Sequence, residues 1–259
     1  MTLVHPLAVV DSAARLGDGV RVGPFAVIGA GVEIGDGTEV GAGAKVLVPA
    51  RIGRENRIYP NAAIGFDPQD LKFQGEEVWL EIGDRNHFRE FCTVHRGTAK
   101  GGGVTRVGSD SLFMAYTHIG HDSQIGNGCI LANSATLAGH VIVEDFAVVG
   151  ALCPVHQFCR IGRYAYIGAC TVITQDVPPF SRVVTERETR CYGVNSIGLS
   201  RHGFSRERLD AIERAYRLLL RSKLNTSQAV EQMRADLDGS ADVAELIAFI
   251  ESAERGLTK

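Results

Sequence analysis

The chain carries an aliphatic residue at every sixth position from its start. The series runs through Val4, Val10, Leu16, Val22, Ile28, Ile34, Val40, Val46, Ile52, Ile58 and Ile64. Four positions after each member the residue is usually small, as at Ala8, Ala26 and Ala44. A half-buried strand repeats every second residue and a helix every third or fourth, so neither element alone produces this period. The period indicates a stack of similar short units.

The same register returns further along the chain. It includes Ile82, Phe88 and Val94, and then Val107, Phe113, Ile119, Ile125, Leu131, Leu137, Val143, Val149, Val155, Ile161, Ile167 and Ile173. Two segments, 66–79 and 95–106, fall outside the register, and their composition is typical of loops. We expect both loops to project from the stack.

One large and one small residue in every six is the pattern of a parallel β-helix, in which each unit is a short strand and a corner. Three units close one triangular coil of 18 residues, and stacked coils bury a column that no single repeat could bury. Thirty glycines along the chain suit many tight corners. An ordinary sandwich of short strands does not predict a fixed spacing of six. We therefore predict an all-β parallel β-helix over residues 1–190.

From Phe204 the pattern changes to helical spacing. One helical face carries Leu209, Ile212, Tyr216, Leu219 and Leu220, and Ser205 is the expected N-cap. The segments 226–237 and 240–257 repeat this spacing, each with Ser or Thr at its start. Gly256 is the expected stop of the last helix. We predict a small α-helical C-terminal domain over residues 191–259.

Composition narrows the class of protein. A net charge of −3 gives no whole-chain argument for nucleic-acid binding. The six cysteines form no CxxC pair and several occupy small inward positions, so we expect reduced core thiols. No run of 18 apolar residues predicts a membrane span, and the first residues do not resemble a secretory signal. We expect a cytoplasmic protein.

A group of histidines recurs at one point of the repeat. Residues 18 apart occupy successive coils, about 4.8 Å from each other. One such column consists of Ile119, Leu137 and Val155, and three histidines follow it within three positions: His121, His140 and His156. Their neighbours are Asp122, Gly139 and Gln157, and His118 ends the preceding unit. We therefore expect these side chains to converge at one corner.

Besides ordinary solvated histidines, two kinds of chemistry remain open for this corner. One is a zinc site, as in hexapeptide-repeat proteins similar to γ-class carbonic anhydrases, whose paired histidines are more widely spaced. The other is general-base catalysis, with neutral His121 taking a proton from a hydroxyl and Asp122 fixing its tautomer. The backbone N–H of Gly139 would then stabilise an oxyanion. No Ser or Cys beside His121 offers a nucleophile, which favours direct acyl transfer.

Several longer runs carry a family resemblance: QDLKFQGE, EIGDRN, TVHRGT, HIGHD, ILANSATLAGHV, VHQFCRIG, QDVPPF and RHGFS. In this order, and over essentially the full length, they resemble the bacterial UDP-N-acetylglucosamine O-acyltransferases that begin lipid A biosynthesis. The resemblance implies a homotrimer of left-handed parallel β-helices with active sites between subunits and without metal or cofactor. It also implies transfer of an (R)-3-hydroxyacyl chain from acyl carrier protein to the 3-hydroxyl of UDP-N-acetylglucosamine.

The resemblance further implies roles for individual residues. It makes His121 the general base, Asp122 its partner and Gly139 the oxyanion donor. The substrate cleft would be lined by His95, His118, His140, His156 and Gln157. The sugar and its phosphate would contact Asp70 and Lys72, the nucleotide end would contact Asn195 and Arg201, and Ala169 would limit the acyl chain length.

The chain departs from this family in the nucleotide region. Ile197 stands where relatives usually carry glutamate, His202 stands where they often carry a second arginine, and segment 182–195 differs from their short turn. These changes leave open a 3-amino UDP-sugar as acceptor, which would give an amide. A non-catalytic, nucleotide-sugar-binding β-helix is another alternative. The N-acyltransferase of the same pathway normally has an additional N-terminal domain, whereas the repeat here begins at Val4.

Charge is concentrated in one part of the chain. Residues 182–223 contain five Asp or Glu and ten basic residues: Arg182, Arg187, Arg190, Arg201, Arg206, Arg208, Arg214, Arg217, Arg221 and Lys223. A basic surface of this kind would suit an acidic carrier protein and a diphosphate. The alternative is an ordinary solvated helix face.

Overall fold

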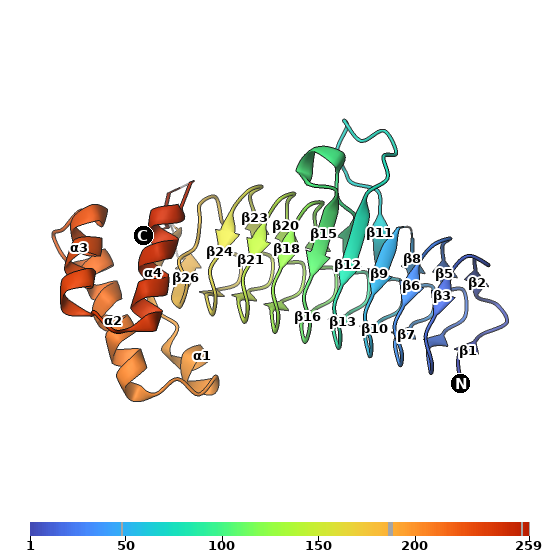
Figure 1. The fold of residues 1–259 in the computed structure, drawn as a ribbon, viewed down its shortest axis with the longest axis horizontal. Helices are drawn as coiled ribbons and strands as arrows, with labels where there is room; N and C mark the ends of the chain where they lie inside the picture. The colour runs from blue at the N-terminus through green and yellow to red at the C-terminus, as the bar shows by residue number, and fades with distance from the viewer. Residues whose placement is uncertain (48, 186–188, 255, 259) are drawn as a thin grey trace.

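Short strands wind into a left-handed parallel β-helix, and the helices α1–α4 pack at its C-terminal end (Figure 1). The computed structural model describes all residues except 48, 186–188, 255 and 259. Each coil contributes one strand to each of three sheets, which we call faces A, B and C. The fold predicted from the six-residue period is confirmed.

The strands of the three faces have the following bounds. Face A contains β1 (Leu3–Val4), β4 (Arg21–Val22), β7 (Glu39–Val40), β10 (Arg57–Ile58), β13 (His87–Phe88), β16 (Leu112–Phe113), β19 (Ile130–Leu131), β22 (Val148–Val149), β25 (Tyr166–Ile167), β26 (Ser181–Thr185) and β27 (Thr189–Val194). Face B contains β2 (Val9–Val10), β5 (Val27–Ile28), β8 (Lys45–Val46), β11 (Ala63–Phe66), β14 (Thr93–His95), β17 (His118–Ile119), β20 (Thr136–Leu137) and β23 (Pro154–Val155). Face C contains β3 (Arg15–Leu16), β6 (Glu33–Ile34), β9 (Ala50–Ile52), β12 (Trp79–Ile82), β15 (Val104–Val107), β18 (Gln124–Ile125), β21 (Ile142–Val143) and β24 (Arg160–Ile161).

The register between coils follows the predicted spacing. His118 pairs with Thr136, 18 residues later, and the strands are parallel. At two places the chain leaves the register, between β11 and β12 and between β14 and β15, and the second loop contains the 3-10 helix η1 (Ala99–Gly101). Both loops connect face B to face C, so they project from the same edge of the column (Figure 1).

The core is the predicted column of aliphatic side chains. Ile28, Ile119 and Leu137 are almost completely buried, and each contributes about 1.5–3 kcal/mol by leaving water. Where Asn56 replaces a small inward residue, its side-chain oxygen accepts from the Asn86 backbone N–H at 2.9 Å, so the polar group is satisfied inside the stack.

The six cysteines are free, and five of them are buried. Burial raises the pKa of the Cys92 thiol to about 11 and that of Cys129 to about 12. These side chains therefore remain neutral thiols that fill small inward positions, as the sequence predicts, whereas Cys170 is exposed at a corner.

The C-terminal segment forms α1 (Ser196–Arg201), α2 (Arg206–Arg221), α3 (Thr226–Asp236) and α4 (Ala241–Ser252). Ser205 caps α2 as predicted, but α3 is capped by Asn225 in a capping box. Gly256 as the stop of the last helix is wrong. The helix ends at Ser252 because Ala253 is extended and the chain then pairs back to the β-helix through Leu257. The expected domain boundary at 190/191 falls within β27.

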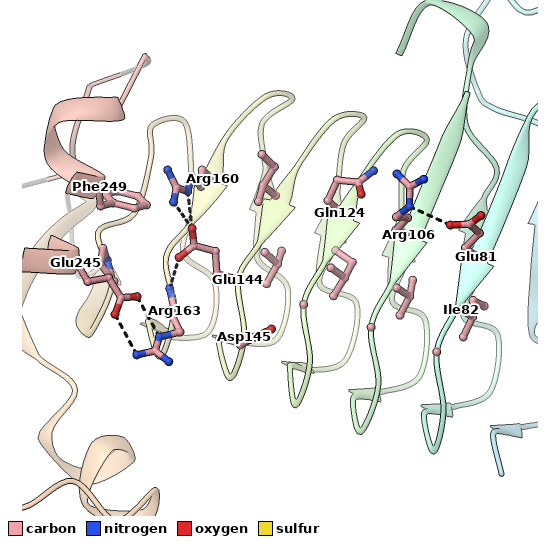
Figure 2. A pocket seen from close by; sticks show the side chains of 18 of the residues that line it. Glu81, Ile82, Arg106, Gln124, Glu144, Asp145, Arg160, Arg163, Glu245 and Phe249 are labelled. Carbon is pink, nitrogen blue, oxygen red and sulfur yellow. Dashed lines mark hydrogen bonds and ion pairs between the residues drawn. The ribbon is translucent and has the colours of Figure 1, made fainter. Parts of the chain in front are cut away.

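Paired charges attach α4 to the β-helix. The Arg163 guanidinium donates two hydrogen bonds of 3.0 Å to the Glu245 carboxylate, and Arg160 lies over the Phe249 ring at 4.6 Å (Figure 2). The bidentate geometry makes Arg163–Glu245 a directional contact rather than a loose surface pair. No described helix is long and apolar enough to cross a membrane.

Candidate active site

The candidate histidines lie along the edge between faces B and C. His95 and His118 belong to strands of face B, and His121, His140 and His156 lie in successive corners that lead from face B to face C. Both loops leave the column from this edge. The repeat therefore gathers most of the titratable groups singled out in the sequence on one side of the molecule.

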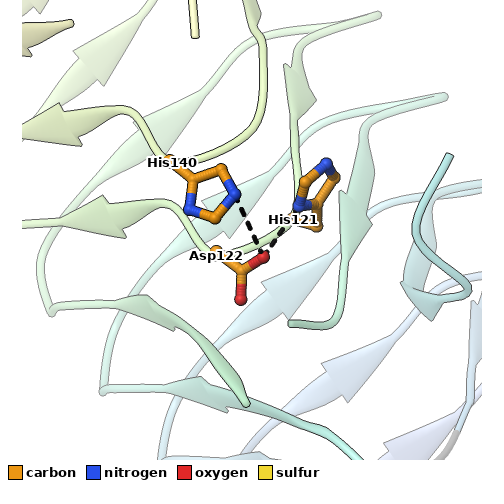
Figure 3. Close-up of side chains that lie close together, drawn as sticks. All are labelled: His121, Asp122 and His140. Carbon is orange, nitrogen blue, oxygen red and sulfur yellow. Dashed lines mark hydrogen bonds and ion pairs between the residues drawn. The ribbon is translucent and has the colours of Figure 1, made fainter. Parts of the chain in front are cut away.

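His121 and Asp122 form a hydrogen-bonded pair at the centre of this edge (Figure 3). Nδ1 of His121 lies 2.8 Å from Oδ2 of Asp122, and Nε2 of His140 lies 3.7 Å from the same oxygen. The Asp122 side chain is fully buried, while 18% of the His121 side chain is exposed. The pair thus has a protected carboxylate and an imidazole that substrate can reach.

Hydrogen bonds keep the buried carboxylate ionised. Burial by itself would raise the pKa of Asp122, but donors on His121 and Thr98 outweigh it and the pKa lies below its ordinary value. An ionised carboxylate only accepts hydrogen bonds, so Nδ1 of His121 carries the proton. Nε2 is then the unprotonated nitrogen, which a general base requires.

Gly139 lies one coil away from His121, in the corner after β20. A Cβ atom at this position would come within 2.5 Å of His121 Cε1 and 2.6 Å of Nε2, so only glycine leaves room for the ring. Within the described residues, its backbone N–H makes no hydrogen bond. An N–H in this position beside His121 is suited to hold a developing oxyanion.

His95 and His118 form a second, more buried pair. Their rings meet edge to face at 4.8 Å, and Nδ1 of His118 lies 2.8 Å from the Thr93 hydroxyl. Burial, followed by the nearby histidines, lowers the pKa of His95 to about 4, and burial with His121 lowers that of His118. Both are therefore neutral at pH 7, and Nδ1 of His95 has no hydrogen-bond partner in the described part of the chain.

The other two predicted corner histidines differ in their contacts. His140 meets the His121 ring edge to face at 5.2 Å and stacks on Phe158 at 4.5 Å. His156 is exposed, and its Nδ1 lies 3.0 Å from the backbone oxygen of Gln157. The structure therefore brings His140 against the pair and leaves His156 and Gln157 at the open end of the same edge.

The first loop presents Asp70 and Lys72 near this edge. Asp70 accepts the Lys72 backbone N–H at 3.0 Å, and the Lys72 side chain is exposed. An ion pair between Asp67 and Arg96 joins this loop to the second one. The two loops are therefore joined to each other at the edge from which both leave the column.

Asn195, Arg201 and Ala169 lie on other edges of the column. Asn195 caps α1, accepting the Gly198 N–H at 3.2 Å, and donates to the Tyr164 carbonyl at the edge between faces C and A. Arg201 ends the same helix. Ala169 is exposed in the corner that leaves face A after β25. Within one chain these residues do not join the His121 group.

Two of the three sequence departures lie around α1, whereas segment 182–195 falls in β26 and β27, with residues 186–188 outside the described part of the chain. Ile197 is 71% exposed, so its apolar side chain faces solvent beside this helix. His202 lies against the aromatic stack of the edge between faces C and A, 5.0 Å from Tyr164 and 5.1 Å from Phe146. The His202 imidazole is exposed and rests on the outer side of these rings.

Three residues that were not expected from the sequence also contact this group. Thr98 and Thr105, in and after the second loop, both bond to Asp122, and Phe158 supports His140. The run TVHRGT contains Thr98 but does not show which side chain it meets. The 18-residue spacing does place Phe158 above His140, so that contact could have been predicted.

A metal site is the other possible use of this group. Ligand atoms of His121, Asp122 and His140 lie within 4.8 Å of one another, so two imidazoles and a carboxylate are available. However, Oδ2 of Asp122 already accepts from His121 and from the Thr98 hydroxyl. A metal would have to displace these donors, so the contacts fit a hydrogen-bonded catalytic pair better than a ligand set.

A separate groove of about 1060 Å³ lies between face C and α4 (Figure 2). Its four arginines are each paired with a carboxylate: Arg51, Arg106, Arg160 and Arg163. None of the candidate histidines lines it. Arg163 pairs with Glu245 of α4, while the other three pair with Glu81 or Glu144 of the column, so each of the four cations already has an acidic partner.

Comparisons with known proteins agree over the whole chain. A family model described as UDP-N-acetylglucosamine O-acyltransferase, domain 2, matches residues 176–258, and one for bacterial transferase hexapeptide repeats matches residues 2–47 and 105–139. An acyl-[acyl-carrier-protein]–UDP-N-acetylglucosamine O-acyltransferase from Halorhodospira halophila is 52% identical over 259 residues, with 100% of both chains covered. One from Stenotrophomonas maltophilia is 51% identical over 256 residues, covering 99% of this chain and 97% of the relative.

Solved structures show the same similarity. The UDP-N-acetylglucosamine acyltransferase of Bacteroides fragilis has a TM-score of 0.96 and 42% identity, covering 99% of this chain and 100% of the other. That of Francisella novicida has a TM-score of 0.94 and 37% identity, covering 99% and 94%. Both β-helix and helical segment lie within these matches.

Proposed function

The chain belongs to the UDP-N-acetylglucosamine O-acyltransferase family, and from this membership and its His121–Asp122 pair we propose its reaction. It transfers an (R)-3-hydroxyacyl chain from acyl carrier protein to the 3-hydroxyl of UDP-N-acetylglucosamine, the first step of lipid A biosynthesis. The observation that carries the mechanism is the buried, ionised Asp122 that holds the proton on Nδ1 of His121.

The reaction proceeds by direct transfer. Nε2 of His121 takes the proton of the sugar hydroxyl as its oxygen attacks the thioester carbonyl carbon. The tetrahedral oxyanion accepts a hydrogen bond from the Gly139 N–H. The carbonyl then re-forms, the carbon–sulfur bond breaks, and the departing thiolate takes the proton from His121. Histidine supplies all the acid–base chemistry, so the reaction needs no metal or cofactor.

The surrounding residues bind the acceptor. His95 and His118 are neutral, so they offer hydrogen bonds to sugar hydroxyls without adding charge beside the base. His140, His156 and Gln157 extend the same edge, and Asp70 and Lys72 approach the sugar and its phosphate from the first loop. An exposed lysine provides the charge that a phosphate requires.

The position of the remaining residues supports a homotrimer. Asn195 and Arg201 lie at the edge between faces C and A, and Ala169 lies at the edge between faces A and B, while His121 lies at the third edge. A neighbouring copy that packs its face A against face B of the first would bring its edge with Asn195 and Arg201 beside His121, and its Ala169 would lie at the far edge of the same interface. The complete site then forms between subunits, with Ala169 limiting the acyl chain.

The basic segment is the proposed contact for the acidic carrier protein. Arg208 is paired with Asp242 and Arg206 with Asp210, so these two contribute to the fold. By contrast, no described acidic side chain pairs with Arg182, Arg217 or Arg221, which line one pocket between β27 and α2. Free guanidinium groups attract acidic surfaces and phosphates. Arg187 and the side chain of Arg190 lie outside what the structure describes.

We also propose a reducing, cytoplasmic location, which the six free cysteines support.

The deciding experiment is acyl transfer by the purified protein from (R)-3-hydroxyacyl carrier protein, with UDP-N-acetylglucosamine and its 3-amino analogue as parallel acceptors. Ester formation with the first supports the proposal. Amide formation with only the second would make the enzyme a 3-amino-sugar acyltransferase and would assign that preference to the region of Ile197 and His202. Absence of product from either acceptor, with the oligomer intact, would leave a nucleotide-sugar-binding β-helix. Light scattering at the monomer mass would contradict the homotrimer.

A further inference from the structure

The second loop holds the Asp122 carboxylate with two groups of one residue. The Thr98 backbone N–H donates to Oδ1 at 2.8 Å, and the Thr98 hydroxyl donates to Oδ2 at 2.7 Å. Thr98 is 7% exposed and the Asp122 side chain is fully buried. Hydrogen bonds to an ion in such a dry environment are stronger than bonds between neutral groups.

The direction of the Thr98 hydroxyl proton is fixed by its other partner. Its oxygen accepts the Gly101 backbone N–H at 3.1 Å, where Thr98 caps η1. One lone pair of the hydroxyl is therefore occupied, and its proton points to Asp122. Gly101 and Gly103 also donate to the Thr98 carbonyl, at 3.0 and 2.8 Å, so the loop itself is closed around this residue.

These bonds determine which histidine the carboxylate serves. Oδ2 lies 2.8 Å from Nδ1 of His121 but 3.7 Å from Nε2 of His140. With both oxygens held by Thr98, the carboxylate cannot rotate to equalise the two distances. We propose that Thr98 is a positioning residue for the acyl transfer proposed above, fixing Asp122 so that it orients His121. This inference rests on the proposed function of His121 as the base.

Gly101 shows how closely the loop packs on the carboxylate. A Cβ atom at Gly101 would lie 2.1 Å from Asp122 Cγ, a distance that real side chains do not adopt. Gly102 and Gly103 have left-handed backbones, but Gly101 does not. Space for Asp122, rather than backbone conformation, therefore requires glycine at position 101.

The electrostatics agree with this geometry. After the cost of burial, the hydrogen bonds from His121 and Thr98 lower the pKa of Asp122. Removing the hydroxyl should raise this pKa and weaken the hold on the Nδ1–H tautomer of His121.

The test uses Thr98→Val, which keeps the branched shape and the backbone N–H but removes the hydroxyl, and Thr98→Ser, which restores it. We expect Thr98→Val to lower kcat on the order of 10-fold, the size of one hydrogen bond to a charged group, and to leave both KM values unchanged. Its acid limb in the pH–rate profile should move to higher pH. Thr98→Ser should recover kcat and the profile. Lys100→Ala is the matched control, since this exposed side chain lies on the same loop without touching Asp122.

A second readout does not depend on activity. Carboxyl carbon and imidazole nitrogen NMR titrations of selectively labelled protein report the pKa of Asp122 and the tautomer of His121. We expect Thr98→Val, and independently Gly101→Ala, to raise the pKa of Asp122 and to reduce the population of His121 that carries its proton on Nδ1. Unchanged titrations would overturn the inference, as would a loss of kcat with an unmoved profile that serine does not rescue. Wild-type protein that transfers no acyl group but shows the expected titrations would refute the proposed function alone.

Discussion

The close approach of Gly139 to His121 gives the sharpest prediction. In Gly139→Ala the new methyl group would lie 2.5 Å from His121 Cε1, whereas ordinary contact begins at 3.4 Å. The Gly139 backbone is outside the left-handed region, so alanine adds no backbone strain. The nearest atoms belong to a side chain, so the ring moves and the coil remains.

The size of the effect follows from that displacement. The ring must shift by roughly 0.9 Å, which lengthens its 2.8 Å bond to Asp122 and moves Nε2 away from the acceptor hydroxyl. A misplacement of about 1 Å costs about 100-fold in rate, or about 2.7 kcal/mol of barrier. We expect kcat to fall by this factor while the melting temperature and oligomer mass stay those of wild type.

The assay is single-turnover acyl transfer, run as a double-mutant cycle with His121→Ala. If the methyl acts through the imidazole, Gly139→Ala should cause no further loss when the ring is already absent. Wild-type rates in Gly139→Ala, or an equal loss in the His121→Ala background, would refute the reasoning and place the effect elsewhere in the site.

Three further changes test other parts of the account. Asp122→Asn removes the charge and keeps a residue type that tolerates the left-handed corner (φ 60°). It should lower kcat by roughly 10²–10⁴-fold, and a kcat within threefold of wild type would contradict the role of Asp122. His95 has a pKa of about 4 in the folded protein, against 6.5 in the unfolded chain. Because the unfolded chain takes up the proton at higher pH, the free energy of unfolding should fall by about 3 kcal/mol as the pH drops from 6.5 to 4. Urea unfolding of His95→Gln should lack this slope, and an identical slope would be inconsistent with a neutral buried ring. Ala169→Met should shift preference to shorter acyl chains in a carrier-protein substrate series, whereas an unchanged ranking would remove Ala169 as the limit.

The sequence predicted the column and its histidine edge because both depend on counting. A period of six fixes which residues point inward, and a period of 18 fixes which corners stack, so Asp122 and His140 had to be neighbours. The contact of Thr98 with Asp122 was not predictable, because Thr98 lies in a loop whose length breaks the register. The end of α4 was also missed, since a tertiary pairing of Leu257 stops the helix before its local signal at Gly256.

Residues away from the histidine edge show a second limit on what can be predicted from the sequence. The family resemblance implied Asn195 and Arg201 as part of the site, but one chain keeps them on another edge of the column. Which edge faces which in an assembly depends on a second copy, and no periodicity within one sequence contains that information.

The most direct test of the central claim is the rate of acyl transfer by His121→Ala beside wild type. His5→Ala serves as the control, since His5 is an exposed histidine in the first coil. A general base contributes roughly 10²–10⁴-fold, so we expect kcat to fall within that range in His121→Ala alone, with the oligomer intact. Transfer within threefold of wild type would show that the His121–Asp122 pair is not the catalytic base.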